Sequence, residues 1–273
     1  MRYAYFIACV FLCFCGISLA DDAPPVLYLS APAQYPGQPS CPLLVRELAR
    51  QAFLIAARDG MGLYTRDAAM REWEPDSAGN PPADAQGKPA LLINMRVGKD
   101  SEQTTLNLIA MSPERPEVFS SAVNTPHELK YFMSVPSALA NIEPLSRGDF
   151  VDQLKKLGYT ADVKPPGDLD VAPEVDHLLY QTTLLSPFTV VQQMHAAIRK
   201  TGESPARLSA LVRGYANLGE LTRFQWCSIQ KVMTARSLLY AQRMVNEAPD
   251  SPFSYYNRAY AYAMTGLHAA ALA

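Results

Sequence analysis

The sequence is poor in cysteine and in net charge, and each shortage excludes a class of protein. Only 5 cysteines occur among 273 residues, and Cys9, Cys13 and Cys15 lie within the first 20 positions. The other two allow at most one disulfide within the chain, so this is no disulfide-rich small domain. The formal net charge is −2, and no long block of either sign occurs. We therefore expect neither a nucleic-acid partner nor an anionic membrane surface.

The signatures of common catalytic and cofactor sites are also missing. His127 and Glu128 begin a pattern similar to a zinc-protease helix, but Tyr131 stands where the second histidine is required. No nucleophile elbow, phosphate loop or paired Cys-x-x-Cys site is present. We assign no catalytic residue, no metal ligand and no cofactor. An enzyme assembled from residues distant in sequence stays an alternative, because catalytic groups meet in space.

Residues 1–20 have the pattern of a cleavable secretory signal peptide. Arg2 supplies a charged start, an apolar stretch follows, and Ser18, Leu19 and Ala20 form a small-x-small cleavage site. The apolar stretch is shorter than the roughly 20 residues that a spanning helix needs, and no later stretch is long enough. We expect an exported protein, periplasmic or extracellular, without a membrane span.

The composition after the leader, 49% hydrophobic over the whole chain, is ample for a buried core and predicts two domains. Residues 21–40 form an extended lead-in rich in proline and alanine. Residues 41–163 combine a helix that starts at Pro42 with an alternating pair of segments near Leu91 and Leu106 that predicts a β-hairpin. This pattern predicts an α+β domain in which helices cover a short antiparallel sheet.

A proline-rich stretch, residues 164–175, predicts an exposed linker, and the remaining residues 176–273 are predicted to be all-α. Ser-Pro pairs at Ser186, Ser204 and Ser251 each mark a helix start, because serine caps free backbone donors and proline fits the first helical turn. Short connections between these helices predict antiparallel hairpins.

The last of these hairpins resembles the tetratricopeptide repeat (TPR) family. Tyr255, Ala259, Tyr262, Gly266 and Ala271 match the family's large, small, aromatic, glycine and alanine positions. The match covers one incomplete unit, with a weaker one around Leu208 to Gly219, and a plain helical bundle stays an alternative. The chain ends early in the second helix of a unit, so the resemblance implies an array that is truncated.

The TPR resemblance implies a concave groove that binds a protein or peptide ligand. Carried onto this sequence, the groove-lining positions are Arg213 and Asn217 in the earlier unit and Tyr256 and Tyr260 in the later one; core packing is the alternative role for the tyrosines. We expect an exported, non-catalytic binding protein, with a secreted hydrolase whose site lies in the α+β domain as the alternative. Whether Cys41 and Cys227 form a disulfide, and what the oligomeric state is, stay open.

Overall fold

The structure is a computed structural model that describes residues 26–29, 43–61, 65–66, 90–99, 103–112, 115–126, 131–156, 163–225 and 229–273. The predicted signal peptide, most of the lead-in, and both Cys41 and Cys227 lie outside the described residues. The cleavage site and the disulfide therefore stay predictions.

The first half of the chain contributes α1 (Leu43–Met61), α2 (Tyr131–Leu145), a π-helical turn η3 (Ser146–Phe150) and α3 (Val151–Lys156). The helix predicted from Pro42 is confirmed by α1. It buries almost every side chain described in its first four turns, so it is enclosed on several sides instead of covering one sheet face.

The second half is a succession of helices: α4 (Pro173–Leu179), α5 (Leu185–Thr201), α6 (Pro205–Leu221), α7 (Ile229–Glu247), α8 (Pro252–Met264) and α9 (His268–Leu272). Two of the three Ser-Pro pairs begin helices as predicted. Ser204 accepts a hydrogen bond from the Arg207 backbone N–H at the start of α6, and Ser251 precedes α8. The third pair lies one residue inside α5.

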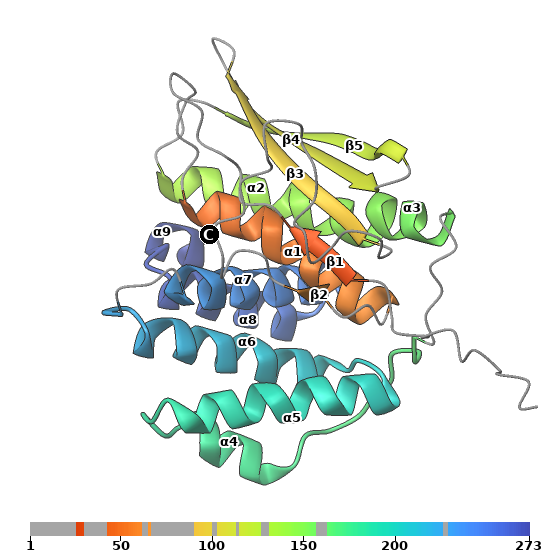
Figure 1. Cartoon of the computed structure of the whole chain (residues 1–273). Coiled ribbons are helices and arrows are strands. Elements are labelled where there is room, and N and C mark those ends of the chain that lie inside the picture. The colour runs from red at the N-terminus through yellow and green to blue at the C-terminus, as the bar shows by residue number, and fades with distance from the viewer. Residues whose placement is uncertain are drawn as a thin grey trace, which may run out of the picture.

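The helices of the second half pack mainly against their chain neighbours (Figure 1), and α6 also contacts both α4 and α8. Glycine allows the close approaches of α6. A Cβ atom at Gly214 would lie 2.9 Å from Val191 Cγ2 on α5, and one at Gly219 would lie 3.1 Å from Thr234 Oγ1 on α7. An added methyl group at Gly214 would require Val191 to move, and one at Gly219 would require Thr234 to give way slightly.

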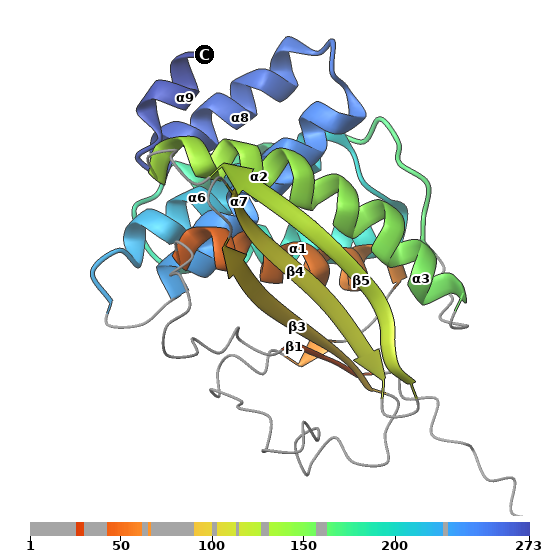
Figure 2. The same cartoon turned by 90° about the horizontal axis from the view of Figure 1, so that it is seen from above.

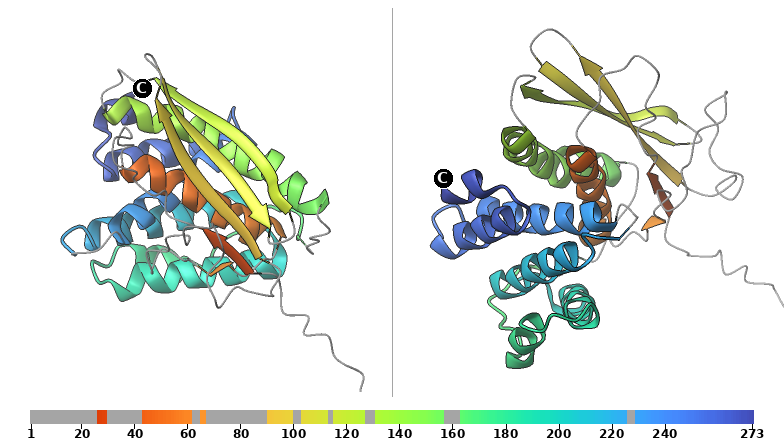
Figure 3. Two further views of the ribbon diagram at one scale, coloured as in Figure 1. Left: turned by 45° about the horizontal axis from the view of Figure 1, so that its top comes forward. Right: turned by 90° about the vertical axis from the view of Figure 1, so that its left-hand side faces the viewer.

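Five strands complete the described backbone: β1 (Val26–Leu29), β2 (Thr65–Arg66), β3 (Ala90–Lys99), β4 (Gln103–Ser112) and β5 (Arg115–Pro126). Their order is β2-β1-β3-β4-β5, with β1 parallel to both neighbours and β3, β4 and β5 antiparallel. The strands lie on the side of α1 and α2 that faces away from α4, α5 and α6 (Figures 2 and 3).

The predicted fold class, an α+β domain in which helices cover a short antiparallel sheet, followed by an all-α domain, is wrong. The residues whose side chains are described are 79% helical and include no strand. Their hydrophobic core is one cluster that runs from Leu48 of α1 through Leu139 of α2 to Leu238 of α7. The helices expected to cover a sheet thus bury apolar faces against the second half of the chain. Periodicity shows that a helix has an apolar face, but not which element covers that face.

The segment predicted as a linker runs along the turn between α5 and α6. The backbone N–H of Gly167 donates to the Glu203 carbonyl at 2.8 Å, and the Ser204 hydroxyl donates to the Leu169 carbonyl at 2.6 Å. Most of its side chains are exposed. The domain boundary placed at residues 164–175 stays a prediction. Within the described part of the chain, no helix combines the length and the apolar character that crossing a membrane requires.

Candidate functional site

The residues predicted to line a groove come from α6 and α8, and α6 packs against both α4 and α8. We call the face formed by Asp176, Tyr180, Arg213, Asn217, Tyr256 and Tyr260 the α4–α6–α8 surface. Each of its helices begins with proline in the first turn. Proline has no N–H to lose at that position, so these starts are locally favoured.

Arg213 of α6 is held by α4. Its guanidinium Nη1 donates to Asp176 Oδ1 at 2.6 Å, and its Cζ atom lies 5.5 Å from the centre of the Tyr180 ring. The Arg213 side chain retains 25% of its exposure, whereas the Asp176 side chain retains 59%. The Arg213 guanidinium is therefore oriented by one carboxylate and one ring, and part of it still faces solvent.

Asn217, one turn further along α6, joins three helices. Its Nδ2 donates to the carbonyl of Leu179 at the end of α4, at 2.9 Å. Its Oδ1 accepts a hydrogen bond from the Tyr260 hydroxyl of α8 at 3.0 Å. The carbonyl of Leu179 belongs to the last turn of α4, where carbonyls lack helical partners. Asn217 thus provides a hydrogen-bond donor for one of these carbonyls, and its two contacts fix the spacing of α4 and α8 on either side of α6.

The two predicted tyrosines of α8 differ in their surroundings. Tyr260 packs against the hydrophobic core; burial raises its pKa, the charge of Arg213 lowers it, and nearby Tyr256 raises it. Tyr256 is 67% exposed. The structure therefore brings Arg213, Asn217, Tyr256 and Tyr260 together on one surface, and whether they bind a partner stays a prediction.

Sequence reasoning did not find Tyr180, which is the most exposed aromatic residue of this surface at 79%. It caps the C-terminal end of α4. The sequence offered little signal for it, because α4 starts 32 positions before α6 (205 − 173), whereas α6 starts 47 positions before α8 (252 − 205), so the spacing does not repeat. In addition, α4 is only 7 residues long and carries no repeat pattern of its own.

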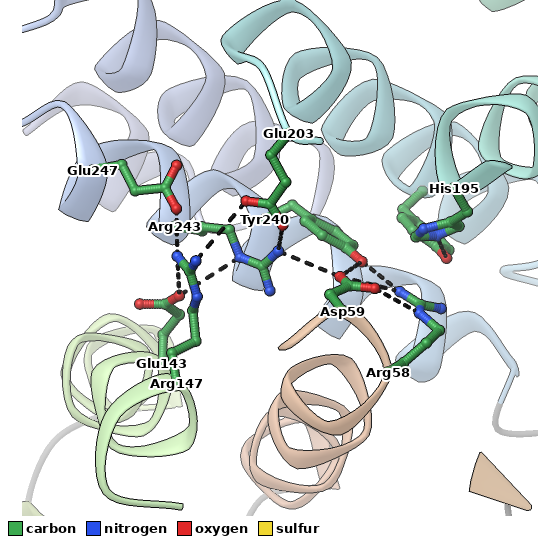
Figure 4. Close-up of polar contacts among 10 residues, drawn as sticks. Arg58, Asp59, Glu143, Arg147, His195, Glu203, Tyr240, Arg243 and Glu247 are labelled. Atoms are coloured by element: carbon green, nitrogen blue, oxygen red, sulfur yellow. Dashed lines mark hydrogen bonds and ion pairs between the residues drawn. The ribbon is translucent and has the colours of Figure 1, made fainter. Parts of the chain in front are cut away.

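A second polar assembly, also missed from the sequence, lies inside the molecule (Figure 4). At its centre is Arg243 of α7, which retains 3% side-chain exposure. Its Nη1 atom lies 2.5 Å from Glu203 Oε1 and 3.3 Å from Asp59 Oδ2, and its Nε atom lies 3.8 Å from Glu143 Oε1. We call Arg243 and these three carboxylates the buried ionic network; at its edge, Arg147 pairs with Glu247 at 2.5 Å, and both of these side chains are 37% exposed.

The carboxylates of this network have displaced pKa values. Burial alone would raise the pKa of Asp59, but Arg58 and Arg243 outweigh it and hold that pKa well below its ordinary value. Burial raises the pKa of Glu143 and of Glu203 despite the opposing charges of Arg243 and Arg147. Asn246 donates to Glu143 as well. Buried carboxylates tolerate this position only because they are paired and hydrogen-bonded.

The buried ionic network continues into three packed rings. Tyr240 donates to Asp59 Oδ2 at 2.8 Å and accepts from Arg58, and its ring stacks on Tyr215 with centroids 5.9 Å apart and planes 4° apart. The His195 Nε2 atom lies 2.7 Å from the Tyr215 hydroxyl. His195 is thus a buried helical residue that is hydrogen-bonded to Tyr215.

These contacts join α1, α2 and α7 to one another and to the turn before α6. Over the residues that the structure describes, no group of three or more histidine, cysteine, aspartate or glutamate side chains could hold a metal ion. The α4–α6–α8 surface is our candidate for recognition because it exposes Tyr180 and Tyr256 together with part of Arg213. Compared with known proteins, the chain matches no family model, no curated protein and no solved structure.

Proposed function

We propose that this chain is an exported, non-catalytic protein whose α4–α6–α8 surface binds an extended segment of a protein or peptide partner. The observation that carries the proposal is the exposure of Tyr180 and Tyr256, at 79% and 67%, on either side of Arg213. Tyrosine and arginine are the side chains most often found as anchors in protein interfaces, because they combine large contact area with polar donors.

The arrangement of the helices supports a linear ligand. Helices α4, α6 and α8 lie side by side, and Asn217 sets their spacing through contacts with Leu179 and Tyr260. A rigid surface made of successive helices gives evenly spaced contact positions, as in helical repeat proteins. The resemblance of residues 255–271 to the TPR family and the leader-like residues 1–20 support the binding and the export parts of the proposal.

Site-specific photo-crosslinking tests the proposed surface directly. A photoreactive amino acid at position 256, in protein exported from its native host, should trap a protein partner covalently. The same amino acid at position 255 is the matched control, because Tyr255 is the adjacent tyrosine of α8, 43% exposed, and stacks under Arg258.

The Kd of each variant for the trapped partner then shows whether the α4–α6–α8 surface contributes to binding. Tyr180→Ala and Tyr256→Ala should each weaken binding by about 1 kcal/mol or more, roughly fivefold in Kd. Tyr255→Ala should leave Kd unchanged. Equal losses for Tyr255→Ala and Tyr256→Ala, or the same crosslinked species from both positions, would place the interface elsewhere and remove the proposal.

A further inference from the structure

Three arginines from three helices lie near enough to the imidazole of His195 for their charges to act on it. Two of them contact the tyrosines whose rings pack on that imidazole: Arg58 donates to the Tyr240 hydroxyl and Arg236 to the Tyr215 hydroxyl. Arg58 comes from α1, Arg199 from α5 and Arg236 from α7. Arg199 lies one turn beyond His195 on the same helix, so the two side chains are neighbours. We call these three residues the arginine cluster.

Arg236 is bound by uncharged groups. Its Nε donates to Gln51 Oε1 at 2.8 Å, its Nη1 donates weakly to the Tyr215 hydroxyl at 3.4 Å, and its Cζ lies 5.6 Å from the centre of the Tyr215 ring. Within the described ranges, no carboxylate forms an ion pair with either Arg236 or Arg199. Among the residues that the structure describes, two guanidinium groups of the cluster thus have no carboxylate partner.

The third, Arg58, has a carboxylate that is already shared. Its Nε lies 2.8 Å from Asp59 Oδ1, while Asp59 Oδ2 accepts hydrogen bonds from Tyr240 and Arg243. The cluster therefore contains three positive charges, and the negative charge beside them is the Asp59 carboxylate, which also pairs with Arg243. A positive excess of this kind, partly withdrawn from water, is costly unless an anion compensates it.

The positive charge of the cluster also affects the pKa of the His195 imidazole. Burial lowers its pKa first, the charge of Arg58 lowers it further, and Arg236 and Arg199 add to this effect against the opposing charge of Asp59; the pKa falls to about 3. His195 thus stays neutral, and the side chain that faces the cluster contributes no charge at neutral pH.

We propose that the arginine cluster is a binding site for a small oxyanion, either inorganic phosphate or the phosphate group of a monoester. Guanidinium groups donate paired N–H bonds that match the oxygens of phosphate, and three of them arriving from three helices suit a tetrahedral group with several acceptors. Arg199 is exposed, and the side chains of Arg58 and Arg236 are partly exposed, so solvent contacts all three arginines of the proposed site.

Thermal unfolding of the purified protein in phosphate gives the first test. Inorganic phosphate should raise the unfolding midpoint in a saturable way, and sodium chloride at matched ionic strength should not. Arg199→Gln and Arg236→Gln should each raise the apparent Kd by at least about tenfold, since each removes a charge-assisted contact. Arg207→Gln is the matched control, because the Arg207 guanidinium is engaged by Thr201 and by the Gly202 carbonyl.

The imidazole resonances of His195 give a second readout that is independent of stability. Bound phosphate should shift them and raise the pKa of His195, while those of His268 stay in place. Phenyl phosphate separates the two sources: equal binding indicates the end group of a larger ligand, and its exclusion indicates the free ion. An effect equalled by chloride, or an Arg199→Gln variant that folds and binds phosphate like the wild type, would overturn the site.

Discussion

At the scale of single residues, we expect Arg243 to be important for the stability of the fold, because its guanidinium is the shared partner of carboxylates from three segments of the chain. Asp59 lies on α1, Glu143 on α2 and Glu203 in the turn before α6. Replacing a buried ion pair as a whole is often neutral, but removing one member leaves the other buried and uncompensated.

Arg243→Met should therefore lower the free energy of unfolding by about 3–5 kcal/mol, because three buried carboxylates lose their common counter-charge. Arg223→Met is the matched control: Arg223 pairs with Glu220 at 3.4 Å, but its side chain is 60% exposed. Its removal should change stability by about 0.5 kcal/mol or less. Urea denaturation of both variants measures the difference, and similar small effects would mean that the buried ionic network contributes little.

His195 gives the residue-scale dependence of stability on pH. Its pKa is about 3 in the folded protein and 6.5 when unperturbed, so the unfolded chain takes up the proton first as the pH falls. Above pH 6.5 His195 is neutral in both states and does not disfavour folding. As the pH drops from 6.5 toward 3, protonation of the unfolded chain lowers the free energy of unfolding by up to about 1.4 kcal/mol per pH unit. The raised pKa values of Glu143 and Glu203 act in the opposite sense, since their carboxyls favour the folded state when protonated.

Comparing the wild type with His195→Gln isolates the histidine, because the glutamates are common to both proteins. Glutamine keeps a hydrogen-bonding partner for Tyr215 and cannot titrate. We expect the stability of the wild type relative to the variant to fall steadily between pH 6.5 and pH 4.5, measured by urea denaturation at each pH. Parallel curves over this range would show that His195 is protonated in the folded protein.

At the scale of elements, the turn between α5 and α6 depends on a single glycine. Gly202 has φ of 93°, and a Cβ atom there would lie 2.1 Å from the carbonyl oxygen of Pro165. Positive φ is costly for other residues, and a backbone atom cannot move aside as a side chain can. The turn, the segment that runs along it and the position of Glu203 therefore depend on this residue.

Gly202→Ala should destabilise the protein by about 3 kcal/mol or more, from strained φ together with steric overlap. Gly266→Ala separates these causes: Gly266 also has a positive φ, 79°, but nothing lies within 4 Å of the added methyl group. That control should cost only about 1 kcal/mol. Thermal unfolding of both variants measures the contrast, and equal losses would mean that the contact between the turn and Pro165 is unimportant.

Helix positions were the most predictable elements, because their signals are local. The starts of α6 and α8 follow from Ser-Pro, and the extent of α1 follows from apolar spacing that ends near Gly60. The family pattern was less reliable for packing: Tyr255, expected as the large packing residue, is 43% exposed, whereas Tyr262 is 5% exposed.

The candidate sites were likewise predictable only where the signal in the sequence was local. Arg213, Asn217, Tyr256 and Tyr260 could be placed on one surface because a helical frame fixes their relative positions. The buried ionic network could not be found, since Asp59, Glu143 and Arg243 are separated by up to 184 positions. Each sits on its own helix in a pattern common to solvated charges, and only the packing of α1 and α2 against α7 brings them together.

At the scale of the whole molecule, the described helices of both halves share one core. α7 packs against α6 and α8 on the chain-neighbour side and against α1 and α2 on the other. The buried ionic network lies across this junction and joins α1, α2 and α7 by charge as well as by apolar contact. We expect the two halves to unfold together, because small units with a continuous core behave cooperatively.

Cleavage of the connecting segment tests this expectation. Residues 165–168 are exposed and joined to the turn by few hydrogen bonds, so a protease that cuts before aspartate should nick the chain at Asp168 or Asp170. The fragments should nevertheless remain associated during native size-exclusion chromatography, since the core and the ion pairs across α1, α2 and α7 do not depend on that backbone connection. They should separate only in urea.

In Arg243→Met, the nicked fragments should separate at a lower urea concentration than in the wild type, because the buried carboxylates of α1 and α2 then lack a positive partner on α7 and weaken the contact between the fragments. Fragments that separate at once in native buffer would show that each half folds on its own and that the shared core is secondary.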